Sequence, residues 1–344
     1  MNNSLKRINY NLYMNMKKIL GINTSVTERT ITMEHPDEND KIKSLEKAAD
    51  IHKEVRRHLH NILKPGVKLT EIVNMIESKT EELSNKKECI NRGIGFPVGL
   101  SLNSCAAHYH PENNDNTTLK KDDVLKIDFG TEINGWIIDS AFTVYFDEKH
   151  DVLVNAVKEA TETGIKNAGI DVDINDWAKS IKEVMNSYEI NPITNLGGHN
   201  IERGIIHGGY FLPSVPNDNL IYKRMNEGVY AIETFGSTSD SFVHEIGEPT
   251  IFRMKPNCNL TTLKMESTKK TLSTINRKFK TLPFTDRYLS EIQNCKTHLQ
   301  ILNKNNCINS YPPLCVNNGI TAQYEHTIFL GENKKIIFSN GDDY

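Results

Sequence analysis

Two aspartates, Asp128 and Asp139, lie in neighbouring segments whose residues favour β-strands, 124–131 and 136–146. The dipeptide Asn134-Gly135 between these segments is typical of a two-residue β-hairpin loop. Carboxylates held close together in apolar surroundings repel each other unless a cation lies between them. The hairpin is therefore a candidate site for a divalent metal ion, because carboxylate oxygens are suitable ligands for such ions.

The turn also predicts the register of the hairpin. A two-residue loop places Asp139 opposite Gly130, and by the same register Asp128 lies opposite Ala141. Side chains alternate between the faces of a strand, so both aspartates point to the same side as diagonal neighbours. The alternative is that both face water on an exposed sheet surface, and a slip of one residue would separate them.

Three further residues of metal-binding types lie in similar contexts. Glu233 and Glu325 each lie within a strand-like stretch, where a glutamate has low β-propensity and a high cost of burial. His199 follows Gly197-Gly198 and offers a neutral imidazole nitrogen. Each of these residues alone is more often a surface residue or a hydrogen-bonded polar group. Together with the two aspartates, they suit two divalent ions held by four carboxylates and one imidazole.

The elements that must position these residues occur twice along the chain. Helical periodicity is followed by strand-like sequence over about 37–146, and the same order returns over 151–234. The stretch 122–130, which contains Asp128, resembles the stretch 226–236, which contains Glu233. We therefore predict two similar α+β halves, each presenting a carboxylate at an equivalent strand position, with chance similarity as the alternative.

Two regions depart from this repeat. Residues 1–35 are polar and aperiodic, which predicts a loose N-terminal extension ahead of a folded domain over 36–344. Within that domain, strand signals vanish over about 250–309 and helical stripes replace them, which predicts a helical insert in the second half. The segment from Arg253 to Lys280 holds eight Lys or Arg residues and one acidic residue. It is either a solvated face or a docking surface for an acidic partner such as ribosomal RNA.

The overall composition is that of an ordinary globular protein. The 344 residues are 38% hydrophobic and 25% charged, and the formal charge of −3 excludes the strong basicity of a dedicated nucleic-acid-binding protein. No apolar run is long enough for a signal peptide or a membrane span. We therefore predict a cytoplasmic protein with no membrane partner and no specific DNA target.

The six cysteines contain no C-x-x-C pair and no spacing typical of a disulfide framework. They are therefore predicted to be reduced thiols: Cys89, Cys105, Cys258, Cys295, Cys307 and Cys315.

Eight short stretches form a set that is recognisable from its residues and its order. They are Phe96-Pro97-Val98-Gly99, Cys105-Ala106-Ala107-His108-Tyr109, Lys126-Ile127-Asp128-Phe129-Gly130, Ile137-Ile138-Asp139-Ser140-Ala141-Phe142-Thr143, Gly198-His199, Ala231-Ile232-Glu233-Thr234-Phe235-Gly236-Ser237, Tyr311-Pro312-Pro313-Leu314-Cys315 and Gly341-Asp342-Asp343-Tyr344. This set closely resembles the type 2 methionine aminopeptidases from about residue 40 onwards, and the helical insert agrees with that type. The resemblance implies the pita-bread fold, in which two pseudo-symmetric halves surround an antiparallel sheet.

The resemblance also implies roles for individual residues. Asp128, Asp139, His199, Glu233 and Glu325 look like the five metal ligands, with Asp139 and Glu325 bridging both ions. Glu233 is also the implied general base. His108 and His207 resemble two catalytic histidines that contact the substrate. In the same way, five residues resemble those that surround the methionine pocket in this family: Phe96, Ile206, Phe235, His244 and Tyr311.

The activity implied by the resemblance is cotranslational removal of the initiator methionine from nascent polypeptides. The expected cofactors are two divalent ions, which the ligand types allow to be Co, Mn, Fe or Zn. One alternative is a metal-free homologue that binds RNA or the ribosome, but all five ligand positions are filled. A second alternative is a pita-bread peptidase that cleaves X-Pro bonds, against which the insert and the stretch 311–315 argue.

Overall fold

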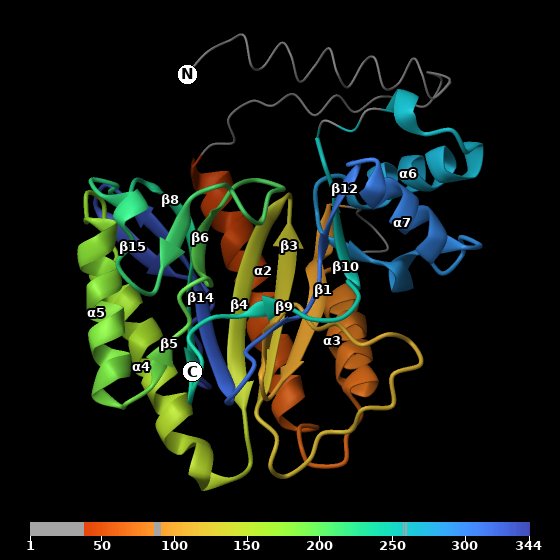
Figure 1. The fold of residues 1–344 in the computed structure, drawn as a ribbon. Coiled ribbons are helices and arrows are strands. Elements are labelled where there is room, and N and C mark those ends of the chain that lie inside the picture. The colour runs from red at the N-terminus through yellow and green to blue at the C-terminus, as the bar shows by residue number, and fades with distance from the viewer. Residues whose placement is uncertain (1–37, 86–90, 257, 259) are drawn as a thin grey trace.

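The first half of the molecule consists of two helices packed on a three-stranded antiparallel sheet. The computed structural model describes residues 38–85, 91–256, 258 and 260–344, so the predicted extension 1–35 and Cys89 lie outside the described residues. Helices α2 (Glu38–His60) and α3 (Leu69–Leu83) precede the strands β1 (Arg92–Leu102), β3 (Leu125–Ile133) and β4 (Trp136–Val144). The sheet order is β1-β3-β4, with α2 against β3 and β4 and α3 against β1 (Figure 1).

The β3–β4 hairpin has the predicted register. Asn134 has φ 56° and Gly135 has φ 85°, which are the two positive values that a type I′ turn requires. Asp139 pairs with Gly130, and Asp128 pairs with Ala141. The prediction is confirmed, and both aspartates lie on one face of the hairpin.

The second half repeats this arrangement with a larger sheet. Helices α4 (Asp151–Asn167) and α5 (Ile174–Ser187) precede a sheet in the order β15-β14-β8-β6-β7, and α4 contacts both β8 and β14. These strands are β6 (Gly197–Ile201), β7 (Phe211–Pro213), β8 (Gly228–Ser237), β14 (Thr321–Gly331) and β15 (Lys334–Ile337), and the short β5 (Asn191–Pro192) pairs with β8. The β8–β14 pair is the counterpart of the β3–β4 hairpin, as the predicted duplication requires.

Side-chain hydroxyls join the two half-sheets where β4 runs beside β14. The Thr327 hydroxyl accepts from the Asp139 backbone N–H at 2.7 Å and donates to the Asp139 carbonyl at 2.6 Å. Ser140 donates to the Glu325 carbonyl at 2.7 Å. Further along, the Thr143 hydroxyl donates to the Gln323 carbonyl at 2.7 Å. At this seam, hydrogen bonds from side-chain hydroxyls to backbone groups join β4 to β14 in place of backbone–backbone hydrogen bonds. They also satisfy buried backbone groups that water cannot reach.

The helices bury amphipathic faces against the sheets. In α5 the apolar positions Ile174, Trp177, Ile181 and Met185 recur at helical spacing and are buried. The side chain of Asp173 starts this helix by accepting the N–H of Asn175 at 2.9 Å. No helix among the described residues is both long enough and apolar enough to cross a membrane.

The insert lies between β8 and β14 and is not helical throughout. It contains helices α6 (Glu266–Phe279) and α7 (Cys295–Lys304), and also a sheet in the order β11-β10-β12 that the sequence did not predict. Its strands are β10 (Ile251–Met254), β11 (Phe284–Thr285) and β12 (Ile308–Tyr311). The apolar spacing of Tyr288, Leu289 and Ile292 predicts a helical stripe, and this prediction is wrong, because Asp286–Leu289 forms a 3₁₀ turn and the next α-helix begins at Cys295. Other 3₁₀ turns lie at Glu148–His150, Asp218–Leu220 and Leu260–Thr262.

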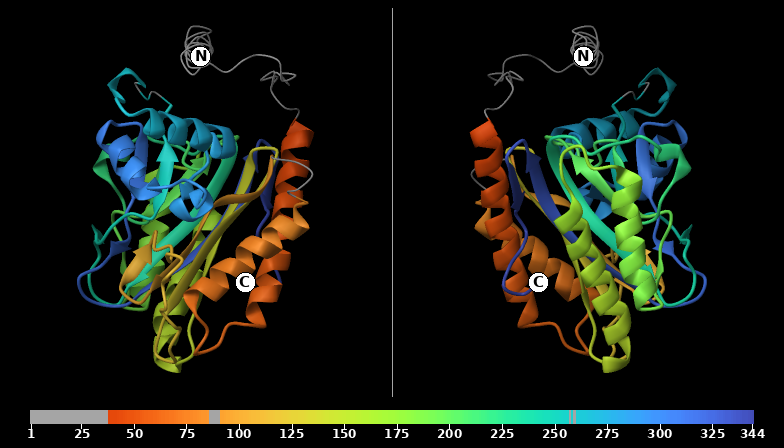
Figure 2. Two further views of the ribbon diagram at one scale, coloured as in Figure 1. Left: turned by 90° about the vertical axis from the view of Figure 1, so that its right-hand side faces the viewer. Right: turned by 90° about the vertical axis from the view of Figure 1, so that its left-hand side faces the viewer.

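The insert and the helices α2 and α3 lie on opposite sides of the first sheet (Figure 2). The insert contacts the first half through its 3₁₀ turn, where Tyr288 donates to the Glu77 carboxylate on α3 at 2.7 Å. A third small sheet, in the order β2-β13-β9, is formed by β2 (Cys105–Ala107), β9 (His244–Glu245) and β13 (Leu314–Cys315). These contacts hold the insert beside the face on which the aspartates lie.

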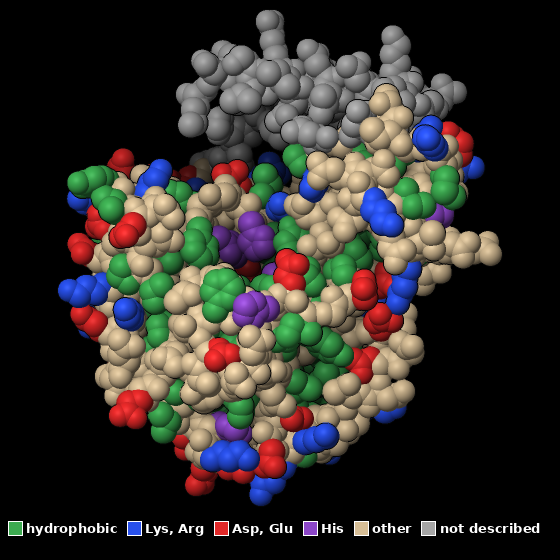
Figure 3. Space-filling view, in the orientation of Figure 1, with side chains coloured by type: hydrophobic (Ala, Val, Ile, Leu, Met, Phe, Trp, Pro, Cys, Tyr) green, Lys and Arg blue, Asp and Glu red, His purple; other side chains and the backbone are tan. Residues whose placement is uncertain are grey.

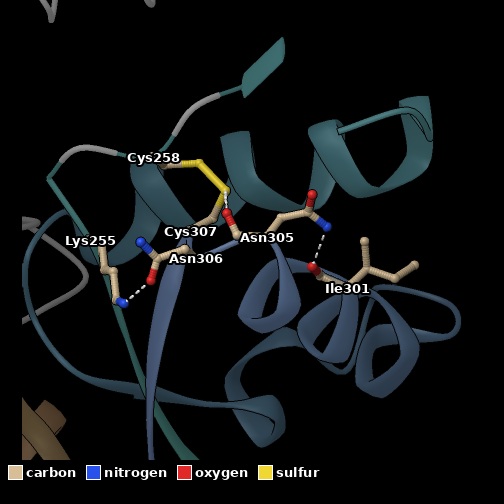
Figure 4. The surroundings of a disulfide bond; sticks show 6 residues. All are labelled: Lys255, Cys258, Ile301, Asn305, Asn306 and Cys307. Atoms are coloured by element: carbon tan, nitrogen blue, oxygen red, sulfur yellow. Dashed lines mark hydrogen bonds between the residues drawn. A yellow bond between two sulfur atoms is a disulfide. The ribbon is translucent and has the colours of Figure 1, made fainter. Parts of the chain in front are cut away.

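A disulfide closes the base of the insert and corrects the prediction of six reduced thiols. Cys258 and Cys307 are bonded, with their Cα atoms 4.3 Å apart (Figure 4). They meet because β10 and β12 pair up to Met254 and Ile308, which brings together two cysteines that are 49 residues apart in sequence. The spacing of the cysteines along the sequence gives no indication of this strand pairing, so the disulfide was not predicted. Cys105, Cys295 and Cys315 are free.

Candidate metal centre and substrate cavity

Four carboxylates and one imidazole converge from five strands of the two halves. Asp128 comes from β3, Asp139 from β4, His199 from β6, Glu233 from β8 and Glu325 from β14. Ligand atoms of Asp139, His199 and Glu325 all lie within 4.8 Å of one another. The structure therefore brings together all the ligand types that the sequence proposed, from segments far apart along the chain.

The imidazole of His199 presents one of its nitrogens to the carboxylates. Its Nδ1 lies 3.3 Å from the Asn200 carbonyl, an acceptor that favours a proton on this nitrogen. Its Nε2 lies 3.5 Å from Asp139 Oδ2 and 3.7 Å from Glu233 Oε1. The Nε2 lone pair is thus free to coordinate an ion between the carboxylates.

Gly198 allows β6 to approach β8 closely enough for this geometry. A Cβ atom at this position would lie 2.4 Å from the Ala231 carbonyl oxygen. Any side chain at position 198 would push the two strands apart, and with them His199 and Glu233.

The buried carboxylates need a counter-charge. Desolvation, and then the charge of Asp139, raise the pKa values of Asp128, Glu233 and Glu325 well above their usual range. Asp128 Oδ1 and Glu325 Oε1 have no hydrogen-bond partner among the described residues, although both atoms are buried. A pair of divalent cations would supply both the missing charge and the missing ligand bonds, so these residues fit a dinuclear metal centre.

Gln323 is a residue of this centre that the sequence analysis missed. Its amide nitrogen donates to Glu233 Oε2 at 3.2 Å and approaches Asp128 Oδ2 at 3.4 Å. It is 1% exposed. The strand period could have revealed it, because Gln323 lies two residues before Glu325 and so on the same face of β14.

An apolar cavity of about 370 Å³ opens beside the carboxylates. Six of the predicted substrate-side residues line it: Phe96, His108, Ile206, His207, Phe235 and Tyr311. Figure 3 shows histidine side chains gathered in a hollow of this face, bordered by hydrophobic groups. His244 is exposed on β9 and is not among the lining residues. The sequence did not indicate Asn195, Leu196, Tyr210, Phe211, Ile251 and Pro283, which also line the cavity.

The rings of His108 and His207 both lie beside the Tyr311 ring. The His108 ring lies edge-on to Tyr311, with centroids 5.6 Å apart, and the His207 ring is 6.3 Å from Tyr311 and 4.4 Å from His199. Burial lowers the pKa of His108 to about 4. Desolvation within the cavity, and then the neighbouring His199, lower the pKa of His207 well below its usual value. Both rings are therefore neutral at pH 7 and can donate a hydrogen bond without bringing a charge.

Comparisons with known proteins identify the family of the chain. Residues 43–248 match Metallopeptidase family M24. "Methionine aminopeptidase 2-1" of Aspergillus flavus is 43% identical over 327 residues, which cover 89% of this chain and 72% of that protein. "Methionine aminopeptidase 2" of Debaryomyces hansenii is 42% identical over 320 residues, covering 89% and 76%.

Among solved structures, a thermophilic Arx1 has a TM-score of 0.78 at 20% identity, covering 89% of this chain and 92% of that one, which shows a shared fold alone. The identities to the curated relatives are much higher and span most of both chains. The chain belongs to metallopeptidase family M24 and, within it, to the type 2 methionine aminopeptidases, hydrolases with a pita-bread fold and a dinuclear metal site.

Proposed function

We propose that this protein removes the N-terminal methionine from nascent polypeptides, with two divalent ions held by Asp128, Asp139, His199, Glu233 and Glu325. One observation carries the proposal: buried carboxylates with unpartnered oxygens border an apolar cavity of about 370 Å³. A cavity of this kind suits an unbranched thioether side chain, and an N-terminal peptide bond would then lie beside the carboxylates.

Glu233 is the proposed general base. Its carboxylate lines the cavity beside the other proposed ligands, where it could take a proton from the attacking water and pass it to the departing amine. When bound, the two ions supply Lewis-acid polarisation and lower the pKa of water from about 15.7 to about 7. Gln323 holds the Glu233 carboxylate in place through its amide N–H.

His108 and His207 are the proposed donors to the substrate. His207 would hold the scissile carbonyl oxygen, and His108 would stabilise the tetrahedral intermediate or the departing nitrogen. Their lowered pKa values keep both rings neutral, so neither repels the cations nearby. Phe96, Ile206, Phe235 and Tyr311 would form the methionine pocket. His244 would contact the substrate further out, at the exposed strand β9.

One experiment separates this function from its rivals. The purified protein is stripped of metal, reconstituted separately with Co, Mn, Fe or Zn, and assayed on a methionyl tripeptide and on an X-Pro peptide. We expect turnover of the methionyl peptide only, and only after reconstitution. Turnover of the X-Pro peptide alone would favour the prolidase-type alternative, and full metal content with no turnover of either peptide would favour a binding protein.

The basic surface of the insert is proposed as a docking site near the source of the substrate. Lys264, Lys270, Arg277 and Lys280 are exposed and make no ion pair with described residues. Such cations attract phosphate, and ribosomal RNA would place the cavity close to emerging N-termini in the cytoplasm. Cosedimentation with ribosomes should weaken steeply with salt, and glutamate at two of these positions should abolish it without changing tripeptide hydrolysis.

A further inference from the structure

Tyr344 reaches the seam between β4 and β14 from behind the metal centre. Its phenol oxygen lies 2.6 Å from Ser140 Oγ, and Ser140 Oγ lies 2.7 Å from the Glu325 carbonyl. Ser140 directly follows Asp139 in β4 and is fully buried. The hydroxyl of Ser140 therefore links β4, which carries Asp139, to the backbone of β14 at Glu325.

The direction of these hydrogen bonds is fixed by chemistry. The Glu325 carbonyl can only accept, so Ser140 uses its single hydroxyl hydrogen there. The hydrogen between Tyr344 and Ser140 must then come from the phenol. Burial raises the pKa of Tyr344 above its usual value, which keeps that hydrogen in place. The result is a chain of donation from Tyr344 through Ser140 to Glu325, in which each bond polarises the next.

The Tyr344 ring is held rigidly enough to orient its phenol. The ring stacks on His326 with centroids 4.7 Å apart, and the Arg56 guanidinium lies 4.3 Å from the ring centroid. Arg56 also makes two hydrogen bonds of 2.8 Å to the Asp343 carboxylate. None of these contacts involves a proposed metal ligand, so they orient Tyr344 independently of the ions, as the preorganisation of a metal site requires.

A second hydroxyl, that of Thr327 on β14, ties the same two strands together at Asp139. Thr327 binds both the N–H and the carbonyl of Asp139, at 2.7 and 2.6 Å. Asp139 and Glu325 are thus each tied to the opposite strand by a hydroxyl. Of these two ties, the one through Ser140 is supported by a further donor, Tyr344.

We propose that Tyr344 is a positioning residue of the metal centre: acting through the Ser140 hydroxyl, it sets the spacing between the Asp139 and Glu325 carboxylates and so tunes metal affinity. The inference rests on the proposed metal ligation. Tyr344 would thus affect the metal centre without contacting any of its ligands, through the Ser140 hydroxyl.

The test is titration of Mn²⁺ into the metal-free protein by calorimetry. Tyr344→Phe keeps the ring contacts and removes only the hydroxyl. We expect two ions to bind with about three- to tenfold weaker affinity, the effect of one net hydrogen bond. Ser140→Ala should weaken binding at least as much. The double variant should bind no more weakly than Ser140→Ala alone, since Tyr344 acts through that hydroxyl.

Tyr230→Phe is the matched control, because Tyr230 is a buried phenol on β8 that donates to the Asn226 carbonyl at 3.0 Å, away from the seam. It should leave Mn²⁺ affinity unchanged. The visible absorption of bound Co²⁺ adds a readout of ligand geometry, and it should change in Tyr344→Phe but not in the control. If Tyr344→Phe behaves like Tyr230→Phe in both measurements, the inference is wrong. Absence of Mn²⁺ binding by the unmodified protein would overturn the metal centre and this inference together.

Discussion

Glu233 and Glu325 are directly opposed on the paired strands β8 and β14, and both carboxylates are buried. Cross-strand pairs of like charge are destabilising even at a surface. Here the charges of Asp128 and Asp139 add to the repulsion, and they raise the pKa values of Glu233 and Glu325 further after desolvation. The metal-free site is therefore a strained arrangement that the fold imposes in advance of its ions.

The first prediction concerns the stability of the metal-free protein. Glu325→Gln removes one of the repelling charges, so the metal-free variant should be more stable than the unmodified protein. The folded pKa of Glu325 is raised, so its carboxyl favours the folded state less and less as pH rises above its unfolded value of about 4.3. The advantage of the variant should therefore grow as pH rises above about 4.3, by at most about 1.4 kcal/mol per pH unit, and level off once the pH passes the raised pKa of the folded state.

Thermal unfolding at several pH values measures this advantage. Glu332→Gln, at an exposed position just beyond the end of the same strand, is the matched control and should change little. With saturating Mn²⁺ the order should reverse, because only the unmodified protein gains binding energy. Peptide hydrolysis by Glu325→Gln should be lost. A metal-free variant less stable than the unmodified protein at every pH would show that Glu325 is not under repulsion.

The second prediction concerns proton release. Asp128, Glu233 and Glu325 have pKa values raised well above their usual range, so without metal we expect this set to retain protons at a pH where free carboxyls have lost them. Binding of the two ions should release at least one proton, and affinity should rise up to about tenfold per pH unit for each proton released. Calorimetry in two buffers with different ionisation enthalpies measures the number directly. Binding heats that do not depend on the buffer would contradict the protonated state.

The third prediction separates the histidines from the ligands. His108→Ala and His207→Ala should each lower kcat on a methionyl peptide by about 10²–10⁴-fold, while both ions stay bound. Because burial lowers the pKa of His108 to about 4, the rate between pH 6 and 8 should not follow its titration. Metal content is measured alongside kcat, with the exposed His58 on α2 as the site of a control substitution to Ala. Loss of metal in step with activity would make either histidine a ligand instead.

The part of the site that lies within one hairpin could be predicted from sequence. Asn134-Gly135 dictates a two-residue turn, the turn dictates the register, and the register places Asp128 and Asp139 on one face. The effect of Gly198 is equally local, because the approach of β6 to β8 beside His199 requires a residue without a Cβ atom. In these cases the physical cause is local, so a few residues carry the whole prediction.

The cavity wall contributed by the insert could not be predicted in this way. Ile251 and Pro283 line the cavity because the insert folds back against the first half, and no local pattern records that docking. The sheet β11-β10-β12 was missed for a related reason. Its strands are two to four residues long, which is too short to show a period of two against the helical stripes around them.

The last prediction tests the link between the insert and the cavity. The Cys258–Cys307 disulfide closes the base of the insert over 49 residues, and in the chain-entropy model a loop of this length corresponds to about 4 kcal/mol of stabilisation. Cys258→Ser should therefore loosen the insert. The insert lines one side of the cavity with Ile251, Pro283 and Tyr311. Loosening it should therefore weaken substrate binding, so KM for a methionyl peptide should rise more than kcat falls.

Cys295→Ser is the matched control, since Cys295 is a free cysteine on α7 of the same insert. It should leave KM and thermal stability nearly unchanged. A reducing agent should bring the unmodified protein to the behaviour of Cys258→Ser and should not affect that variant further. Peptide mapping without reduction identifies the bond itself. If Cys258 and Cys307 are both alkylated in the untreated protein, the insert is held by its β10–β12 pairing and apolar core alone, and KM should then be insensitive to reductant.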